Sequence, residues 1–85
     1  MNVRIEWSIL AVRQLLRLEK QDQRRIGKAI GRLSGFPATA NVRHLANHDP
    51  PYRLRVGNHR VLFSFDGRRR LIVIESVRKR DEHTY

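Results

Sequence analysis

Residues 52–63, YRLRVGNHRVLF, decide the fold of this chain. In the first half of this stretch, apolar side chains alternate with Arg53 and Arg55, which is the two-residue period of a half-buried β-strand. Gly57-Asn58 then supplies the kind of two-residue turn that joins antiparallel strands. The alternation resumes after the turn. The stretch therefore predicts a β-hairpin with one apolar face and one face that carries arginines.

The position of this turn predicts which residues lie opposite each other. Arg55 should oppose Arg60, and Arg53 should lie one step further along on the same face. Val56 should oppose His59 on the other face, so we expect His59 to lean toward the core. Like charges directly opposite each other are unfavourable in a sheet unless an anion lies between them. The arginine-bearing face is therefore a candidate phosphate site.

Further turns and apolar runs extend the predicted sheet on both sides of the hairpin. Asp66-Gly67 indicates another hairpin turn. The apolar run 71–74 predicts a well-covered strand that ends near Val77. Upstream of the hairpin, residues 42–45 predict a short strand. Together these segments predict a meander of three or four mainly antiparallel strands.

The amino-terminal part of the chain predicts one strand and two helices. Residues 2–7 alternate apolar and polar side chains, as a half-buried strand does. Ser8 can cap a helix that runs to about Lys20, and Asp22 can cap a second helix that ends before Gly35. The apolar stripes expected to face the core are Ile9, Val12, Leu15, Leu16 and Leu18, then Ile26, Ala29, Ile30 and Leu33. Because such helices cannot bury their stripes alone, they should cover one face of the sheet, and the predicted fold class is α+β.

Length and composition predict one domain, residues 1–85, that is held together by its core. The 85 residues are too few for two domains. The chain has no cysteine, so neither disulfides nor thiolate metal sites can support the fold. The apolar run 9–12 is far too short for a signal peptide or a membrane span. We therefore expect a cytoplasmic protein without membrane contact.

The charge of the chain predicts a polyanionic partner. The net charge is +10, from 18 Lys and Arg against 8 Asp and Glu. The two halves of the chain share this charge equally, so it belongs to the folded surface and not to one basic tail. Arginine greatly outnumbers lysine, which favours bidentate contacts with phosphate groups.

The carboxyl-terminal segment 78–85, RKRDEHTY, combines three cations with an imidazole and an aromatic ring. Together with the hairpin 52–63 and the apolar run 71–74, this segment resembles the RelE branch of the RelE/ParE toxin superfamily. The resemblance is good for the hairpin and the tail taken together. Residues 8–36 fit the layout of that family with little identity of their own.

The resemblance implies both a fold and a function. It implies a RelE-like toxin of a type II toxin–antitoxin system, which is an endoribonuclease (mRNA interferase) that cuts mRNA on the ribosome and so inhibits translation. It further implies cleavage by attack of the ribose 2′-hydroxyl, without a metal ion or another cofactor. The implied partners are a cognate RelB-like antitoxin, the ribosome and mRNA.

The resemblance also implies the site residues. The basic strand positions of the family fall on Arg53, Arg55 and Arg60, and its tail arginine and terminal tyrosine fall on Arg80 and Tyr85. Cleavage needs a base for the 2′-hydroxyl, cations for the charged phosphorane and an acid for the leaving 5′-oxygen. Arg60 would stabilise the phosphate charge, Arg80 would face the leaving oxygen, and Tyr85 would stack on or orient the scissile nucleotide. The further phosphate-binding candidates are Arg78 and Lys79.

This sequence departs from some members of the family, which have lysines where it has Arg53 and Arg55. A lysine can lower its pKa and act as a base, whereas an arginine cannot. Either the ribosome must position the hydroxyl, or a histidine must act as the base. We expect His83 to be a better candidate than His59. Histidines and carboxylates show no spacing typical of a metal site.

Two other functions remain open at this stage. A ParE-like toxin would share the fold and inhibit DNA gyrase without cutting RNA, although the presence of Arg80 and Tyr85 favours the nuclease. An RNA-binding or ribosome-associated module without toxicity would use the arginines to follow phosphates, or merely to keep the sheet soluble.

Overall fold

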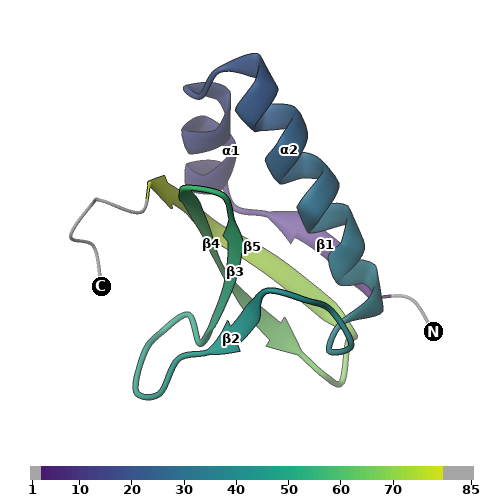
Figure 1. The fold of residues 1–85 in the computed structure, drawn as a ribbon. Coiled ribbons are helices and arrows are strands. Elements are labelled where there is room, and N and C mark those ends of the chain that lie inside the picture. Colours follow the sequence, from purple (N-terminus) through teal and green to yellow (C-terminus); the bar gives the residue numbers. More distant parts are fainter. Residues whose placement is uncertain (1–2, 80–85) are drawn as a thin grey trace.

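A five-stranded sheet covered on one side by two helices makes up the fold (Figure 1). The computed structural model describes residues 3–79. The elements are β1 (Arg4–Trp7), α1 (Ile9–Leu16), α2 (Lys20–Gly31), a 3-10 helix (Arg32–Gly35), β2 (Val42–His44), β3 (Tyr52–Val56), β4 (His59–Asp66) and β5 (Leu71–Lys79). The predicted α+β class is confirmed.

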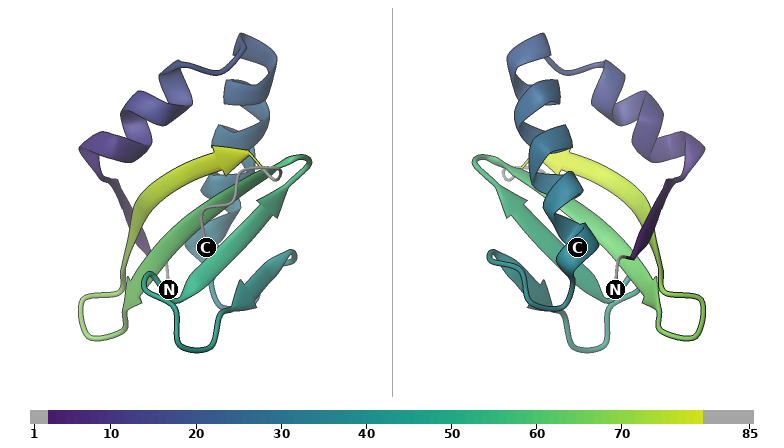
Figure 2. Two further views of the ribbon diagram at one scale, coloured as in Figure 1. Left: turned by 90° about the vertical axis from the view of Figure 1, so that its left-hand side faces the viewer. Right: turned by 90° about the vertical axis from the view of Figure 1, so that its right-hand side faces the viewer.

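The sheet has the strand order β1-β5-β4-β3-β2. β2 to β5 form the predicted antiparallel meander, while β1 lies parallel to β5 at the far edge. Both helices lie on the same side of the sheet (Figure 2). One side is therefore covered, and we call the opposite side the outer face.

The β3–β4 hairpin has the predicted register. Arg55 lies opposite Arg60, and Val56 lies opposite His59. Gly57 opens the turn with φ +56°, a left-handed conformation that a residue without a Cβ adopts at little cost. The hairpin therefore directs its arginines to the outer face and its apolar side chains toward the helices.

The core lies between the sheet and the helices. Its fully buried side chains come from both layers and include Ala11, Ile26, Leu33, Val61, Phe63, Ile72 and Ile74. Phe36 follows the 3-10 helix and contacts three other rings edge-on or tilted, with centroid distances of 5.1 Å to Tyr52, 5.6 Å to Phe63 and 4.8 Å to Phe65. Trp7 of β1 also packs against this core.

The first helix differs from its prediction in length and in the face that it buries. α1 ends at Leu16, and the residue that it buries completely is Ala11, which lets the helix approach β5 closely. Leu15 and Leu18 contact the core as expected. Three residues of the predicted stripe are instead exposed, by 74%, 39% and 64% respectively: Ile9, Val12 and Leu16.

The other element boundaries differ from the predictions by a few residues. α2 begins at Lys20 after Glu19, so Asp22 lies in the first turn and is not the cap. An acidic residue there still suits the positive end of the helix dipole. The loop between β4 and β5 has four residues, 67–70, and is therefore longer than the two-residue turn predicted at Asp66-Gly67. β5 continues past Val77 to Lys79.

A β-bulge interrupts the pairing of β5 with β4. Ile74 pairs with Phe63 and Ser76 pairs with Leu62, so Glu75 is an additional residue without a partner in the ladder. An extra residue shifts the alternation of side chains by one position. Before the bulge, even-numbered residues of β5 such as Ile74 face the core. After the bulge, odd-numbered residues such as Val77 face the core.

This shift decides which face Arg78 occupies. Without the bulge, the alternation that buries Ile72 and Ile74 would also direct Arg78 toward the helices. With the bulge, Val77 enters the core and Arg78 lies opposite Arg60 on the outer face.

α1 holds the bulge by two side-chain hydrogen bonds. Ser8 caps α1 as predicted, accepting a bond from the Ala11 N–H (3.0 Å), and its hydroxyl donates to the carbonyl oxygen of Glu75 (3.0 Å). The side-chain oxygen of Gln14 accepts a bond from the Val77 N–H (2.7 Å). Two backbone groups at the bulge thus have hydrogen-bond partners in α1 and its cap.

We expect Gln14→Ala to lower the free energy of unfolding by about 1 kcal/mol, because a partly buried N–H at the bulge loses its acceptor. Urea denaturation followed by circular dichroism measures this change. Gln21→Ala, at an exposed position of α2, is the matched control for the change in helix propensity. Equal stability of the two variants would contradict a role for the Gln14 bond.

Residues 3–79 include no helix with the length and apolar character needed to cross a bilayer.

Candidate nucleic-acid interface

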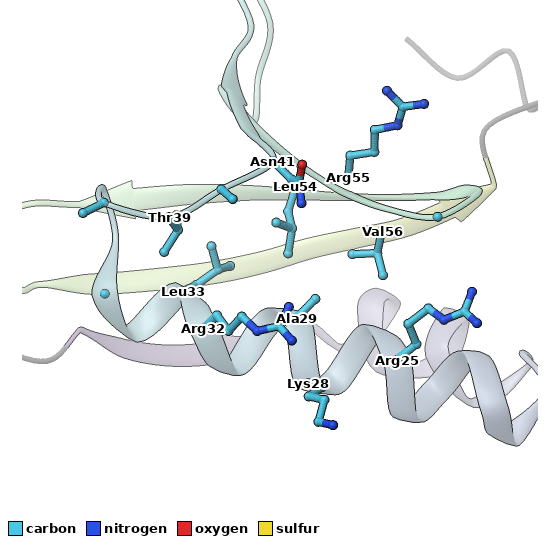
Figure 3. Close-up of a pocket in the computed structure, with 14 residues that line it drawn as sticks. Arg25, Lys28, Ala29, Arg32, Leu33, Thr39, Asn41, Leu54, Arg55 and Val56 are labelled. Atoms are coloured by element: carbon cyan, nitrogen blue, oxygen red, sulfur yellow. The ribbon is translucent and has the colours of Figure 1, made fainter.

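Three arginines form a row across three adjacent strands of the outer face. Arg55 in β3 lies opposite Arg60 in β4, and Arg60 lies opposite Arg78 in β5. Neighbouring strands are about 4.8 Å apart, so the row places three cationic side chains within about 10 Å along the sheet. The side chain of Arg55 points away from α2 (Figure 3). The row is therefore a concentrated positive charge on the side of the sheet opposite the helices.

A second row runs beside the first. Arg43 in β2 lies opposite Arg53 in β3, which lies opposite Leu62 in β4, and Leu62 lies opposite Ser76 in β5. Leu62 and Ser76 are buried. We use the name arginine face for the five arginines of the two rows: Arg43, Arg53, Arg55, Arg60 and Arg78.

Sequence analysis did not identify Arg43. Its strand was expected, but the number of residues that connect β2 to β3 does not reveal which side chains lie opposite each other. The available signal was the alternation along this short strand. Val42 is apolar and contacts the core, so the next side chain, Arg43, points to the opposite face.

The electrostatics of the arginine face favour an anion. The two rows of described residues contain no acidic side chain. Like charges at directly opposed positions of neighbouring strands repel each other. The Nε atom of half-buried Arg53 is buried and has no hydrogen-bond partner in the structure. A phosphate group would relieve the repulsion and accept this hydrogen bond.

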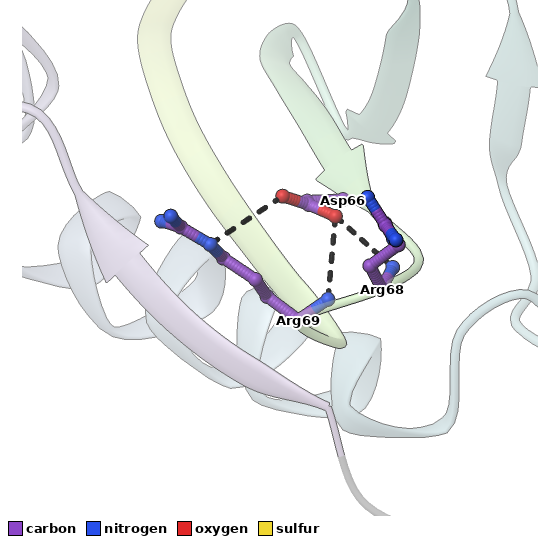
Figure 4. Close-up of polar contacts among 3 residues, drawn as sticks. All are labelled: Asp66, Arg68 and Arg69. Carbon is purple, nitrogen blue, oxygen red and sulfur yellow. Dashed lines mark hydrogen bonds and ion pairs between the residues drawn. The ribbon is translucent and has the colours of Figure 1, made fainter.

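Acidic residues at the other end of the sheet make contacts of their own. Asp66 ends β4, accepts hydrogen bonds from the backbone N–H groups of Arg68 and Arg69 (3.0 and 3.3 Å), and lies 3.9 Å from the Nε atom of Arg69 (Figure 4). Glu6 lies on β1, opposite Val73. Neither carboxylate lies in the two rows of the arginine face.

The histidines within the described residues do not join the arginine face. His59 is 8% exposed and shares the covered face with Val56, so its predicted packing role is confirmed. Its Nε2 atom is buried without a hydrogen-bond partner. His44 is exposed and lies edge-on to Tyr52, with ring centroids 5.1 Å apart. His48 is partly buried, and its Nδ1 atom lies 2.7 Å from the carbonyl oxygen of Pro50.

The structure brings together four of the site residues that the sequence predicted. Arg53, Arg55, Arg60 and Arg78 all belong to the arginine face. Lys79 does not, because it follows Arg78 directly in the strand and lies opposite His59. The remaining candidates lie outside the described residues: Arg80, His83 and Tyr85.

The arginine face can stabilise negative charge but cannot transfer protons near neutral pH. Its two rows contain neither a histidine nor a carboxylate, and arginine keeps its proton. They also contain no aromatic ring on which a base could stack. Within residues 3–79, histidine, aspartate and glutamate side chains form no group of three that could hold a metal ion.

Comparisons with known proteins identify the fold. No protein-family model matches the sequence, and no curated protein matches it. Among solved structures, a chain of the RelBE2 toxin–antitoxin complex of Mycobacterium tuberculosis has a TM-score of 0.79 at 23% identity, over 94% of this chain and 100% of that one. The isolated RelE toxin of E. coli has a TM-score of 0.79 at 12% identity, over 94% of this chain and 86% of that one.

An archaeal structure gives the same result. The RelE–RelB complex of Pyrococcus horikoshii matches with a TM-score of 0.73 at 22% identity, over 96% of this chain and 99% of that one. Because all three identities are below 25%, these similarities establish the fold alone. The predicted resemblance to RelE toxins is therefore confirmed in three dimensions, and the chain has the RelE fold.

Proposed function

We propose that this chain is the toxin of a type II toxin–antitoxin pair and that it cuts mRNA on the ribosome. The observation that carries the proposal is the row of Arg55, Arg60 and Arg78 on the side of a RelE fold opposite the helices. Such a row attracts anions, and an RNA backbone supplies them at regular spacing.

The proposed reaction is a metal-independent transesterification. The ribose 2′-oxygen attacks the neighbouring phosphorus atom and loses its proton to a base. The P–O5′ bond breaks, and the 5′-oxygen takes up a proton as it leaves. The products are a 2′,3′-cyclic phosphate and a 5′-hydroxyl. Arg60, in the middle of the row, would stabilise the extra negative charge of the pentavalent phosphorane.

The other arginines would position the RNA. Arg55 and Arg78 flank Arg60 on the two neighbouring strands, so they can hold the phosphates on either side of the scissile one. Arg53 would add its Nε–H as a donor. Contacts of this kind set the register of the backbone without reading its sequence.

The roles that the arginine face cannot fill fall to the carboxyl-terminal residues and to the ribosome. The face offers no base, so His83 or a ribosomal group would accept the 2′-hydroxyl proton. It offers no aromatic ring, so Tyr85 would stack on or orient the scissile nucleotide. Arg80 would stabilise the leaving 5′-oxygen, with Lys79 as an additional phosphate contact.

The proposed regulator is a cognate RelB-like antitoxin. Two of the similar structures are complexes in which RelE is bound to RelB. A chain with a net charge of +10 favours an acidic partner segment, which would cover the basic surface and exclude RNA. Cytoplasmic location would follow from action on ribosomes.

The direct test maps RNA ends after a brief induction of the protein in growing cells. We expect cuts within translated codons, and products with 5′-hydroxyl ends when the purified protein is added to translating ribosomes. Intact mRNA during toxic expression would contradict the proposal. If DNA damage then accompanied the intact mRNA, the ParE-like function would replace it.

A smaller prediction concerns Arg43, which would contact RNA beside the scissile site. We expect Arg43→Ala to weaken binding of a short, uncleavable 2′-deoxy oligonucleotide and to lower the slope of log affinity against log salt by about 0.7, the value for one lost phosphate contact on a single strand. Fluorescence anisotropy at several salt concentrations measures this slope. Arg13→Ala, in α1 on the covered side, is the control, and an equal change in both variants would refute a specific contact.

A further inference from the structure

A groove of about 470 Å³ lies between α2 and β3, on the covered side of the sheet. The segment 38–41, which leads toward β2, closes one of its sides, and the turn at Gly57 lies at one end. The volume is within the range of about 300–1,000 Å³ that is typical of ligand pockets. Arg55 of the arginine row also lines one edge of the groove, but its side chain points away from α2, so the floor of the groove and its rim on α2 lie apart from the row (Figure 3).

The floor of the groove is aliphatic. Leu33, Leu54 and Val56 belong to the core, and Ala29 is partly buried beside them. None of the fourteen lining residues is aromatic. The floor therefore suits aliphatic side chains and offers no ring on which a nucleobase could stack.

The rim of the groove is cationic. Arg25, Lys28 and Arg32 follow each other at positions i, i+3 and i+7 of α2 and its end, so they lie on one side of the helix. Arg25 reaches the β3–β4 turn, where its Nη1 atom is 3.5 Å from the place that a Cβ on Gly57 would occupy. None of the lining residues is acidic. The rim thus presents positive charge around an apolar floor.

We propose that this groove binds a segment of a partner protein in which aliphatic side chains alternate with carboxylates. The aliphatic side chains would cover Leu54 and Val56, and the carboxylates would meet Arg25 and Arg32. A second copy of this chain is a poor occupant, because its net charge of +10 would repel the rim. The proposal does not depend on RNA cleavage.

The test selects peptides from a random display library on the full-length protein and measures their affinities by fluorescence anisotropy. The groove variant is Arg25→Gln with Arg32→Gln. The matched control is Arg24→Gln with Arg17→Gln. Arg24 is the neighbour of Arg25 in α2 and does not line the groove, and Arg17 is the C-cap residue of α1 as Arg32 is of α2. All four side chains are exposed, so both variants should fold, which thermal unfolding checks.

We expect the selected peptides to be acidic and aliphatic. Their affinity should fall at least about tenfold for the groove variant and change by less than about twofold for the control. Replacing the aliphatic residues of a selected peptide by serine should also weaken binding. Equal losses in both variants, or selected peptides that lack carboxylates or aliphatic residues, would overturn the proposal. So would a short single-stranded RNA whose affinity falls in the groove variant alone, since the groove would then be a nucleic-acid site.

Discussion

Arg60→Ala is expected to lower the rate of mRNA cleavage by about 10²–10³-fold, the usual cost of removing one donor that stabilises charge in a transition state. Arg60 has arginines on both neighbouring strands, at Arg55 and Arg78. It is therefore the residue that the structure places at the centre of the positive charge. Because its contribution would grow as the phosphorane forms, the loss should appear mainly in the catalytic rate constant and less in the affinity for the ribosome. Single-turnover cleavage on purified translating ribosomes separates these two quantities.

Two control variants make this prediction specific. Arg4→Ala removes an exposed arginine from β1, opposite Leu71, on the same outer face but far from the rows. It should cleave at nearly the normal rate. Arg60→Lys keeps the charge but loses the planar guanidinium, so an intermediate rate is expected. A full rate for Arg60→Ala would refute the proposed role, and an equally low rate for Arg4→Ala would indicate a general loss of charge.

Tyr85→Ala should produce the second large loss. The two rows of the arginine face contain no aromatic ring, so a stacking partner for the scissile nucleotide must come from elsewhere. Stacking of a base on an aromatic side chain contributes about 1–3 kcal/mol, which corresponds to about a 5-fold to 150-fold change in rate. Mapping of RNA ends after brief induction, with quantification of each cut, measures the change.

Tyr85→Phe distinguishes stacking from proton transfer. If the ring stacks on the nucleotide, Tyr85→Phe should retain most of the activity. If the hydroxyl orients or protonates a group, Tyr85→Phe should be as slow as Tyr85→Ala. Thermal unfolding of both variants separates a loss of stability from a loss of cleavage. Unchanged cleavage by Tyr85→Ala would remove this residue from the proposed site.

The sequence by itself determined the hairpin and the face of its arginines. The two-residue alternation and the Gly57-Asn58 turn are local features, and together they fix the register in which Arg55 meets Arg60. The cap at Ser8 and the helical stripe of α2 are equally local. Local patterns of this kind were sufficient for the α+β class and for the resemblance to RelE toxins, which the solved structures confirm in three dimensions.

Only the tertiary structure decided how the remaining parts of the arginine face come together. The bulge at Glu75 turns Arg78 to the outer face, and hydrogen bonds from Ser8 and to Gln14, more than sixty residues away in the chain, hold it there. Arg43 joins through the pairing of a short edge strand whose register no local turn fixes. In both cases the face of a side chain depends on contacts between distant segments, and a one-residue change in pairing reverses that face, so no local pattern can predict it.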